Sequence, residues 1–299
     1  MSINMIMIII TKKTQFSLYF QSLFVINRSM KAEKILNHNL DELAEANKNK
    51  FEQNEPFSHI LLEDFFKKDF LQEILDEFPD LEKKNDSMEF NTKSDKKKFA
   101  TNVEFEYPEK ISNFLSFLNS FKFITFLQKL TGIKESLVPD PYFFGGGLHQ
   151  IKRGGFLKVH ADFNYHPQMK LDRRLNLLIY LNKEWKDEYG GFLELWDKNM
   201  KNCVKKLSPR FNNIVVFNTN DYSFHGHPDP LNCPENISRK SIALYYYSNG
   251  RPSKEINPNL RYHNTIYKNR NNSDDNLDER LPEFKKIFGK LYIRKKIKI

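Results

Sequence analysis

A series of short strand-like segments in the second half of the chain limits the possible folds more than any other feature. After Gly145-Gly146-Gly147, apolar and aromatic runs of a few residues alternate with turn signals, and no helical pattern separates them. This texture predicts a mainly β fold, either a sandwich, a jelly roll or a barrel, with flanking helices from the preceding part of the chain. The expected strands are Leu148–Lys152, Phe156–His160, Leu175–Asn182, Phe192–Trp196, Val204–Leu207, Ile214–Phe217, Tyr222–His225 and Lys240–Tyr247.

The part of the chain before these strands is expected to be largely helical. Residues 32–53 are polar and helix-prone, and a strand is expected over Pro56–Leu62. Asp64 is placed to cap a helix that stops at Pro79, and Gly132 is placed to end the last helix of a second pair. The predicted core-facing stripes are Phe66, Phe70, Leu71, Ile74, Leu75 and Phe78, then Ile111, Phe114, Leu115 and Leu118, then Phe123, Phe126, Leu127 and Leu130.

The remaining segments carry fewer structural signals; residues 250–299 are polar, and a helix is expected near Leu281–Tyr292. Residues 80–98 are predicted to be a charged loop, and the triple glycine lacks the Lys-Ser/Thr of a phosphate-binding loop, so it is interpreted as a flexible lead into the sheet. Residues 1–29 hold two apolar patches that are shorter than the roughly 20 residues of a membrane helix. Their charge order differs from that of a signal peptide. We expect a poorly ordered leader, with a membrane-surface anchor as the alternative.

Charge and cysteine content narrow the functional classes. The formal net charge is +9, and lysines and arginines gather at 96–98 and 294–298. A basic periphery in solvent accounts for this charge, and because no nucleic-acid motif accompanies it, no specific nucleic-acid binding is expected. Cys203 and Cys233 are too few for a disulfide framework or a four-cysteine zinc site. A reducing compartment, the cytoplasm, is therefore expected.

A candidate metal site begins at His160-Ala161-Asp162. In an extended segment, residues i and i+2 point to the same side, so these side chains can aim an imidazole and a carboxylate at one point. A third ligand from a distant strand would complete a two-His, one-carboxylate face, which leaves positions open and suits non-haem Fe(II). Either His225 or His227 can supply that ligand.

A candidate anion site follows in the last expected strand. Arg239, Ser241, Ala243 and Tyr245 share one face of this strand. A guanidinium fork, a hydroxyl and a small residue together form a slot for a short carboxylate. A surface arginine leading into a core strand is the alternative, but it leaves the position of Arg239 after the candidate ligands unexplained.

These motifs together resemble the iron- and 2-oxoglutarate-dependent dioxygenases, specifically the prolyl 4-hydroxylase-like branch. The resemblance runs from about Pro56 to Tyr247 and is strongest from Leu148 to Ser248. It implies a double-stranded β-helix (jelly-roll) core with N-terminal helices packed on it. The matching segments are His160-Ala161-Asp162, Leu177–Asn182 with Trp185, Gly190–Trp196, His225-Gly226 and Arg239-Lys240-Ser241.

The implied organisation has three parts. Residues 1–55 form a leader and a polar helical segment, and residues 251–299 form a basic C-terminal extension. Between them lies the dioxygenase domain, residues 56–250, with a helical part over 56–140 and the jelly-roll core over 141–250.

The resemblance also implies a set of metal ligands. His160, Asp162 and His225 would bind Fe(II), because His225 precedes the glycine of the family pattern. His227 is then expected at the rim of the site or behind the ligands. His166 is expected either at the substrate mouth or in solvent.

A second implied set binds the cosubstrate. Arg239 would pair with the distal carboxylate of 2-oxoglutarate, with Ser241 in the same slot. Tyr180 matches a tyrosine that hydrogen-bonds this carboxylate in some relatives. Gln150 stands where some relatives place a second cosubstrate-contacting tyrosine, which is a departure from the family pattern.

The implied reaction uses Fe(II), 2-oxoglutarate and O2, with ascorbate as the expected reductant, and it hydroxylates an unactivated C–H bond with release of succinate and CO2. The primary substrate, a prolyl residue of a protein or peptide or else a small molecule, stays open. Its specificity is expected to depend on residues 84–100, 163–173 and 228–238. Two alternatives remain, a cupin-like metal-binding jelly roll using His225-Gly226-His227, and a non-catalytic binding module with a basic tail.

Overall fold

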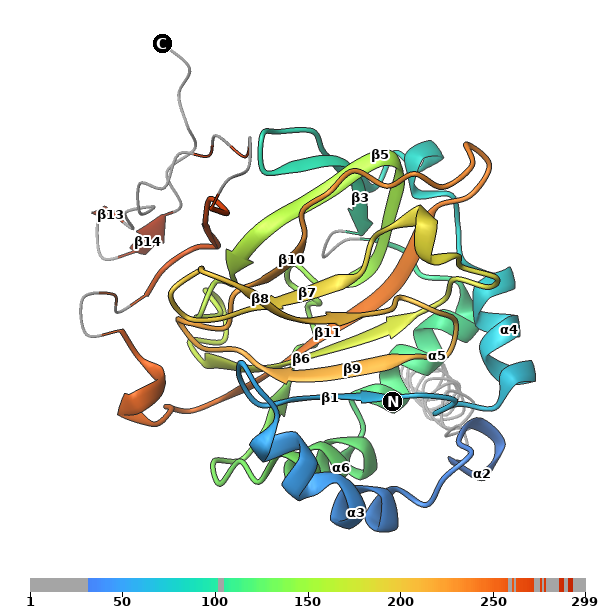
Figure 1. Ribbon diagram of the computed structural model, residues 1–299. Coiled ribbons are helices and arrows are strands. Elements are labelled where there is room, and N and C mark those ends of the chain that lie inside the picture. The colour runs from blue at the N-terminus through green and yellow to red at the C-terminus, as the bar shows by residue number, and fades with distance from the viewer. Residues whose placement is uncertain are drawn as a thin grey trace, which may run out of the picture.

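A mainly antiparallel β-sheet curls into a nearly closed barrel, and helices cover part of its outside (Figure 1). The structure, a computed structural model, describes residues 32–101, 105–257, 260, 262–271, 275, 277, 285–287 and 290–292. The mainly β jelly-roll fold expected from the sequence is confirmed. The expected leader, residues 1–29, lies outside the described residues.

The barrel is built from one large sheet whose path is β1-β9-β6-β11-β5-β10-β7-β8. Three shorter pairings extend this path: β3 joins β5 and β2, β12 joins β5, and β4 joins β11. The strands are β1 (His59–Leu62), β2 (Ser87–Phe90), β3 (Asp95–Thr101), β4 (Val138–Pro139), β5 (Gly147–Ala161), β6 (Asp172–Tyr180), β7 (Leu193–Trp196), β8 (Cys203–Leu207), β9 (Ile214–Asn218), β10 (His225–His227), β11 (Arg239–Ser248) and β12 (Ile266–Tyr267), with a separate hairpin of β13 (Lys285–Ile287) and β14 (Lys290–Tyr292).

Strands β6 and β11 are neighbours in the middle of the sheet and are buried on both faces. Leu175, Leu177 and Leu244 point outward into the core that the sheet shares with the helices. Asn176 and Ser241 point the other way and line a cavity inside the barrel. Because side chains alternate between the two faces of a strand, one apolar run can hold the helices outside and place polar groups inside.

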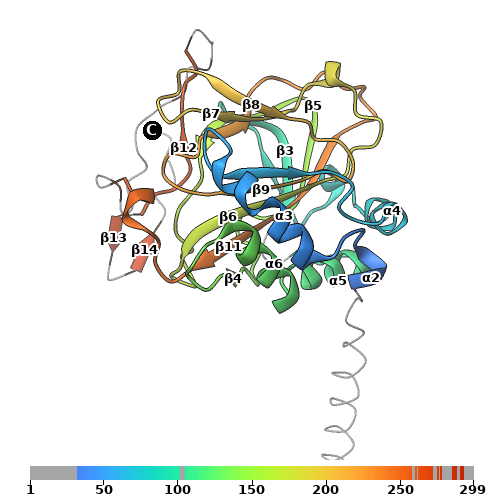
Figure 2. The ribbon, with the colours of Figure 1, turned by 60° about the horizontal axis from the view of Figure 1, so that its bottom comes forward.

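The helices pack against the outer face of the large sheet, with α3 and α6 lying side by side across it (Figure 2). The predicted apolar stripes are buried except for Phe70 and Leu75, which are half-buried, and Gly132 ends α6 in the left-handed region at φ 67°. The helices are α2 (Ala32–Ile35), α3 (Leu40–Gln53), α4 (Lys68–Asp76), α5 (Glu109–Leu118) and α6 (Phe121–Thr131), with short 3₁₀ turns η1 (Leu81–Lys83), η2 (Asp187–Tyr189) and η3 (Ser253–Glu255). In the part of the chain that the structure describes, none of the helices has the length and apolarity to cross a bilayer.

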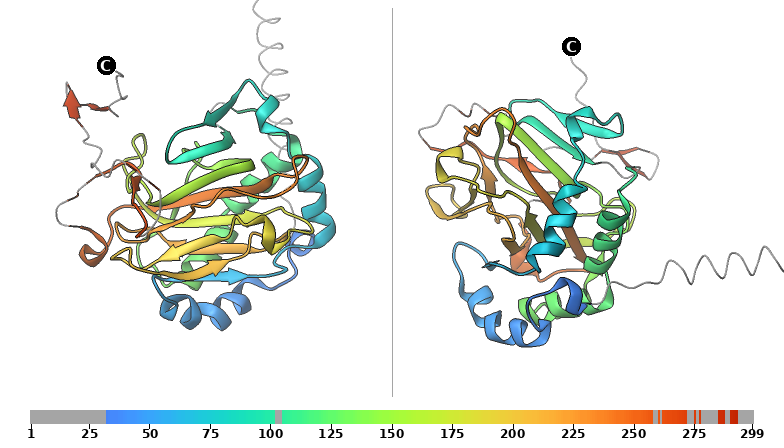
Figure 3. Two further views of the ribbon diagram at one scale, coloured as in Figure 1. Left: turned by 45° about the horizontal axis from the view of Figure 1, so that its top comes forward. Right: turned by 90° about the vertical axis from the view of Figure 1, so that its right-hand side faces the viewer.

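Several local expectations were wrong. Asp64 does not cap α4, because the helix begins at Lys68. Its N-cap residue is Lys67, which makes no side-chain hydrogen bond. The segment predicted as a charged loop contains the hairpin β2–β3, whose lysine-rich strand pairs with β5 at the edge of the barrel (Figure 3). Charged side chains are a usual feature of such edges. The helix expected near Leu281–Tyr292 is contradicted by β13 and β14; the rest of that range lies outside the described residues.

Two expected strands are in fact one, the long strand β5. Gly154, at φ 76°, lies in its middle and lets the chain bend without ending the pairing. The glycines before β5 also serve close packing, because a Cβ added at Gly146 would lie 2.8 Å from the carbonyl oxygen of Ala243. One half of β5 consequently pairs with β11 and the other with β10, so this strand connects both sides of the barrel.

Candidate metal and cosubstrate site

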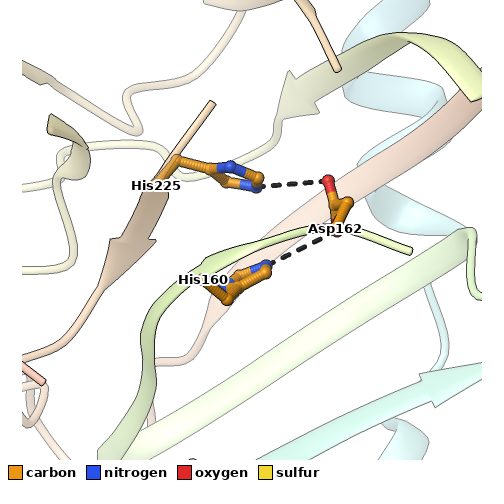
Figure 4. A group of neighbouring side chains, drawn as sticks. All are labelled: His160, Asp162 and His225. Atoms are coloured by element: carbon orange, nitrogen blue, oxygen red, sulfur yellow. Dashed lines mark ion pairs between the residues drawn. The ribbon is translucent and has the colours of Figure 1, made fainter. Parts of the chain in front are cut away.

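Two strands bring the predicted metal ligands together inside the barrel. His160 lies near the end of β5, Asp162 directly follows β5, and His225 begins β10, where it lies opposite His160 in the antiparallel register. Nε2 of His160 is 3.5 Å from Oδ1 of Asp162, and Nε2 of His225 is 3.4 Å from Oδ2 (Figure 4). One possible ligand atom from each residue lies within 4.8 Å of the others, so the set can surround a single cation.

Both imidazoles are oriented by backbone carbonyl groups. Nδ1 of His160 lies 2.8 Å from the carbonyl oxygen of Lys158, and Nδ1 of His225 lies 2.9 Å from that of Ser223. Since a carbonyl only accepts, each Nδ1 carries the proton and each Nε2 presents a lone pair to the centre. Burial lowers the pKa of His225 to about 4 against the opposing effect of Asp162, which leaves the imidazole neutral, the form that binds metals.

The carboxylate of Asp162 is held from behind by two polar groups of β6. Its Oδ2 atom accepts hydrogen bonds from Nη2 of Arg173 at 3.0 Å and from Nδ2 of Asn176 at 2.7 Å. The guanidinium lies over the rings of Phe163 and Tyr245, at 4.3 and 3.4 Å from their centroids. Burial alone would raise the pKa of Asp162, but Arg173 and the two histidines hold it well below its usual range. The carboxylate is therefore ionised and oriented before any cation binds.

Sequence reasoning missed both of these supporting residues. Asn176 is a polar residue inside the apolar run Leu175–Leu181, and Arg173 lies two residues before this run begins. Polar residues that interrupt a strand buried on both faces were the available signal, because such groups need partners inside the protein.

A buried guanidinium lies elsewhere in the same cavity. Arg239 is 5% exposed, donates from Nε to the carbonyl oxygen of Gly191 at 2.8 Å, and donates from Nη2 to the hydroxyl of Tyr180 at 3.3 Å. Within the described ranges, no carboxylate lies close enough to form an ion pair with it. Ser241 faces Tyr180 across the β6–β11 pairing and lines the cavity beside Arg239. This cation consequently has room for an anion that the described chain does not supply.

The cavity that joins the two groups has a volume of about 270 Å³. His160, Asp162, His225, Arg239 and Ser241 all line it. This size is slightly below the roughly 300–1,000 Å³ that is usual for small-molecule sites. The three possible metal ligands and the guanidinium therefore line one common cavity.

Gln150 does not belong to this space, which corrects the expectation that it contacts a cosubstrate. Its Oε1 accepts from the backbone N–H of Leu81 at 2.7 Å, and its Nε2 donates to Oγ of Ser238 at 3.0 Å. His149, one residue earlier on β5, lines the cavity instead. The reason is the two-residue period of a strand, in which a shift of one residue reverses the face.

The other two histidines considered from the sequence have different surroundings. His227 lines the cavity but lies outside the group of possible metal ligands. His166 is fully buried away from the cavity, so the expectation of a mouth or solvent position was wrong. Its Nε2 is 3.3 Å from Oδ1 of Asp140, and its Nδ1 accepts from the backbone N–H groups of Gln168 and Met169.

The mouth of the cavity is formed by segments from both ends of the chain. The hairpin β2–β3 contributes Phe90, Asp95 and Lys98. On the other side, β12 pairs with β5 at His160, and the ring centroid of Tyr267 lies 5.4 Å from that of the imidazole. The hydroxyl of Tyr267 donates to Oδ2 of Asp95 at 2.7 Å, joining the two sides.

This arrangement agrees only in part with the predicted specificity loops. Segment 84–100 contributes to the cavity lining as expected, and segment 163–173 contributes Phe163. None of the lining residues comes from 228–238. Thr265 and Tyr267 were missed, because a two-residue strand in a polar tail gives no pattern that a sequence reading can use.

Two imidazoles and one carboxylate that converge on one point inside a jelly-roll barrel are the arrangement typical of non-haem Fe(II) oxygenases. Residues 146–247 match the model of the 2OG-Fe(II) oxygenase superfamily. The matched residues include all three possible metal ligands and Arg239.

Known relatives are similar over parts of the chain. Mouse prolyl 3-hydroxylase OGFOD1 is 35% identical over 79 residues, which is 25% of this chain and 14% of that protein. Among solved structures, a Trichoplax adhaerens prolyl hydroxylase in complex with a hypoxia inducible factor peptide has a TM-score of 0.53 at 16% identity, covering 70% of this chain and 90% of its own. A Pseudomonas putida prolyl-4-hydroxylase has a TM-score of 0.49 at 13% identity, covering 70% and 100%. The Trichoplax likeness concerns the fold.

Proposed function

We propose that this chain is an Fe(II)- and 2-oxoglutarate-dependent dioxygenase that hydroxylates an unactivated C–H bond. The observation that carries the proposal is one cavity that holds both a two-His, one-carboxylate group and a buried guanidinium without an acidic partner in the described chain. When bound, Fe(II), 2-oxoglutarate and O2 supply an oxidative decarboxylation that yields succinate and CO2 and hydroxylates the substrate.

The residues of the chain would have distinct roles in this reaction. His160, Asp162 and His225 would hold the iron through the atoms that already face one point. Arg239 would hold the distal carboxylate of 2-oxoglutarate, assisted by the hydroxyl groups of Ser241 and Tyr180. The described chain offers this guanidinium no acid of its own, so an anionic cosubstrate would satisfy a charge that is otherwise buried alone.

A prolyl residue of a protein or peptide is the substrate class that we propose first. The support is the partial identity to a prolyl 3-hydroxylase. The mouth would also suit such a substrate, because the rings of Phe90 and Tyr267 offer apolar surface beside the candidate iron site. We further propose ascorbate as the reductant that keeps the iron active, and, from the two unpaired cysteines, a reducing compartment such as the cytoplasm.

The direct test is succinate formation from 2-oxoglutarate by the whole chain with Fe(II), ascorbate and O2. Slow turnover without a primary substrate is expected, with loss of activity on chelation and in Asp162→Ala. Proline-containing peptides should then stimulate succinate formation and gain one oxygen atom, measured by mass spectrometry. Absence of both Fe(II) binding and succinate formation would refute the proposed enzymatic activity. The non-catalytic binding module would then be the remaining assignment.

The cupin-like alternative makes a different demand on the histidines. It needs His227 as a metal ligand beside His225, whereas His227 lies outside the convergent group. If His227→Ala abolished metal binding as completely as His160→Ala, the cupin-like assignment would replace the one proposed here.

A further inference from the structure

His227 is a buried histidine without a hydrogen-bond partner for either ring nitrogen among the described residues. It is 3% exposed and lines the cavity. The two histidines of the candidate metal group differ from it, because each donates its Nδ1 proton to a backbone carbonyl. Buried polar atoms nearly always have partners, so an imidazole with two free nitrogens facing a cavity points to a partner that enters from outside.

The surroundings of His227 indicate what kind of partner this is. Arg239 is the charged group with the largest effect on it, followed by Lys98 and His160. A neutral imidazole carries one N–H donor and one acceptor nitrogen, and neither nitrogen of His227 has a hydrogen-bond partner among the described residues. A donor beside an unpaired guanidinium is suited to an oxygen of an anion.

The alternation along β10 supports this geometry. His225 and His227 are separated by one residue, and both side chains reach the cavity. The register with β5 shifts between them, so that His225 lies opposite His160 while His227 lies opposite Leu157. The shift displaces His227 from the metal group, and it lines the same cavity as Arg239.

We propose that His227 is a cosubstrate-binding residue that donates a ring N–H to the carboxylate held by Arg239. The proposal rests on the proposed function, because the anion is taken to be 2-oxoglutarate. His227 would then complete a carboxylate site with Arg239, Ser241 and Tyr180, in place of the contact expected from Gln150, which lies on the other face of β5.

The test measures binding, without turnover, to the whole chain loaded with Ni(II). Dissociation constants for 2-oxoglutarate and for 2-oxobutyrate, which keeps the keto acid but lacks the distal carboxylate, are determined by calorimetry. His227→Leu should weaken 2-oxoglutarate binding about 10- to 100-fold, the effect of one hydrogen bond to a charged group. Binding of 2-oxobutyrate should change less than about twofold, and His227→Gln, which keeps an N–H donor, should recover part of the loss.

His59→Leu is the matched control, because this buried histidine lies on β1 and is not among the residues that line the cavity. It should leave both dissociation constants unchanged. His227→Met, of similar size and without a donor, takes the place of His227→Leu if the leucine variant does not fold.

Two results would overturn the inference while leaving the proposed function intact. One is unchanged 2-oxoglutarate affinity in the donor-free variant, and the other is an equal loss for both ligands, which would place His227 at the metal end. Failure of the unmodified chain to bind Ni(II) or 2-oxoglutarate would instead refute the proposed function, and the inference with it.

Discussion

Arg173→Met tests whether the metal group is oriented by the protein before a cation binds. The substitution removes the 3.0 Å hydrogen bond to Oδ2 of Asp162 and the two hydrogen bonds to Oδ1 of Asn176 that orient this second donor. A hydrogen bond to a charged group contributes about 1.5–3 kcal/mol. The affinity for Ni(II) should consequently fall roughly 10- to 100-fold, the range found when the outer partners of metal ligands are removed.

Calorimetry with Ni(II) gives this affinity directly, and chemical unfolding with and without the metal gives it independently. A metal that binds only the folded state stabilises it by RT ln(1 + [L]/Kd). If Ni(II) binds 10- to 100-fold more weakly, its stabilisation of the folded state at a fixed, saturating concentration should fall by about 1.4–2.7 kcal/mol. The metal-free variant should also be less stable, because Asp162 is left as a buried charge with fewer partners.

Arg174→Met provides the control. Arg174 is also buried, but it pairs with Glu135 at 2.8 Å and with Ser248 at 3.0 Å, and neither belongs to the candidate metal group. It should lower stability and leave the Ni(II) affinity unchanged. The reasoning fails if Arg173→Met binds Ni(II) within about threefold of the unmodified chain, or if both variants lose affinity equally.

Four other expectations can be measured with the same methods. Asp162→Ala should abolish Fe(II) binding, whereas Arg239→Ala should keep Fe(II) and raise the 2-oxoglutarate requirement of succinate formation about 100-fold; equal metal loss in both would mean that Arg239 is misassigned. Gln150→Ala should lower the free energy of unfolding by about 1–3 kcal/mol, because the N–H of Leu81 loses its partner, with no change in 2-oxoglutarate affinity. Tyr267→Phe should cost about 1–2 kcal/mol in urea unfolding through the lost bond to Asp95; an unchanged midpoint would contradict this. Burial would raise the pKa of Asp221, but hydrogen bonds from His263 and from the backbone of Asn257 lower it. The ionised carboxylate therefore stabilises the folded state above the unfolded pKa near 3.9, and this stabilisation is lost as the pH falls through the lower folded pKa. The stability difference between the unmodified chain and Asp221→Asn should therefore shrink from about pH 5 to pH 3.

The sequence predicted those features that depend on a repeating pattern. The apolar stripes of α5 and α6 and the central strands β6, β9 and β11 have a regular period and appear where expected. The convergence of His160 and Asp162 follows from the same two-residue period. The choice of His225 over His227 could not come from this period, because both reach the cavity; the register shift in β10 separates them.

Features that depend on tertiary context were not predictable in this way. Whether Gln150 or His149 faces the cavity depends on the phase of β5, which is set by its pairing with β11 and not by its own composition. The lysine-rich strand β3 resembles a loop in sequence because its exposed face carries charges, and its pairing with β2 and β5 forms only in the folded chain. Arg173 contacts Asp162 and Tyr267 contacts His160 from positions that only the folded chain brings close to the candidate metal group.

The short strand β12 has a consequence for how the chain could be cut or recombined. It lies beyond the matched family segment, yet the ring of Tyr267 packs on His160, one of the proposed iron ligands. The hydroxyl of Tyr267 donates a hydrogen bond to Asp95 on the other side of the cavity. A protein shortened to the jelly roll alone would keep every proposed metal ligand, but the cavity would be open to water where Tyr267 now lines it. Exchanging residues 262–271 for those of a relative is therefore expected to change this wall of the cavity while keeping all three possible metal ligands.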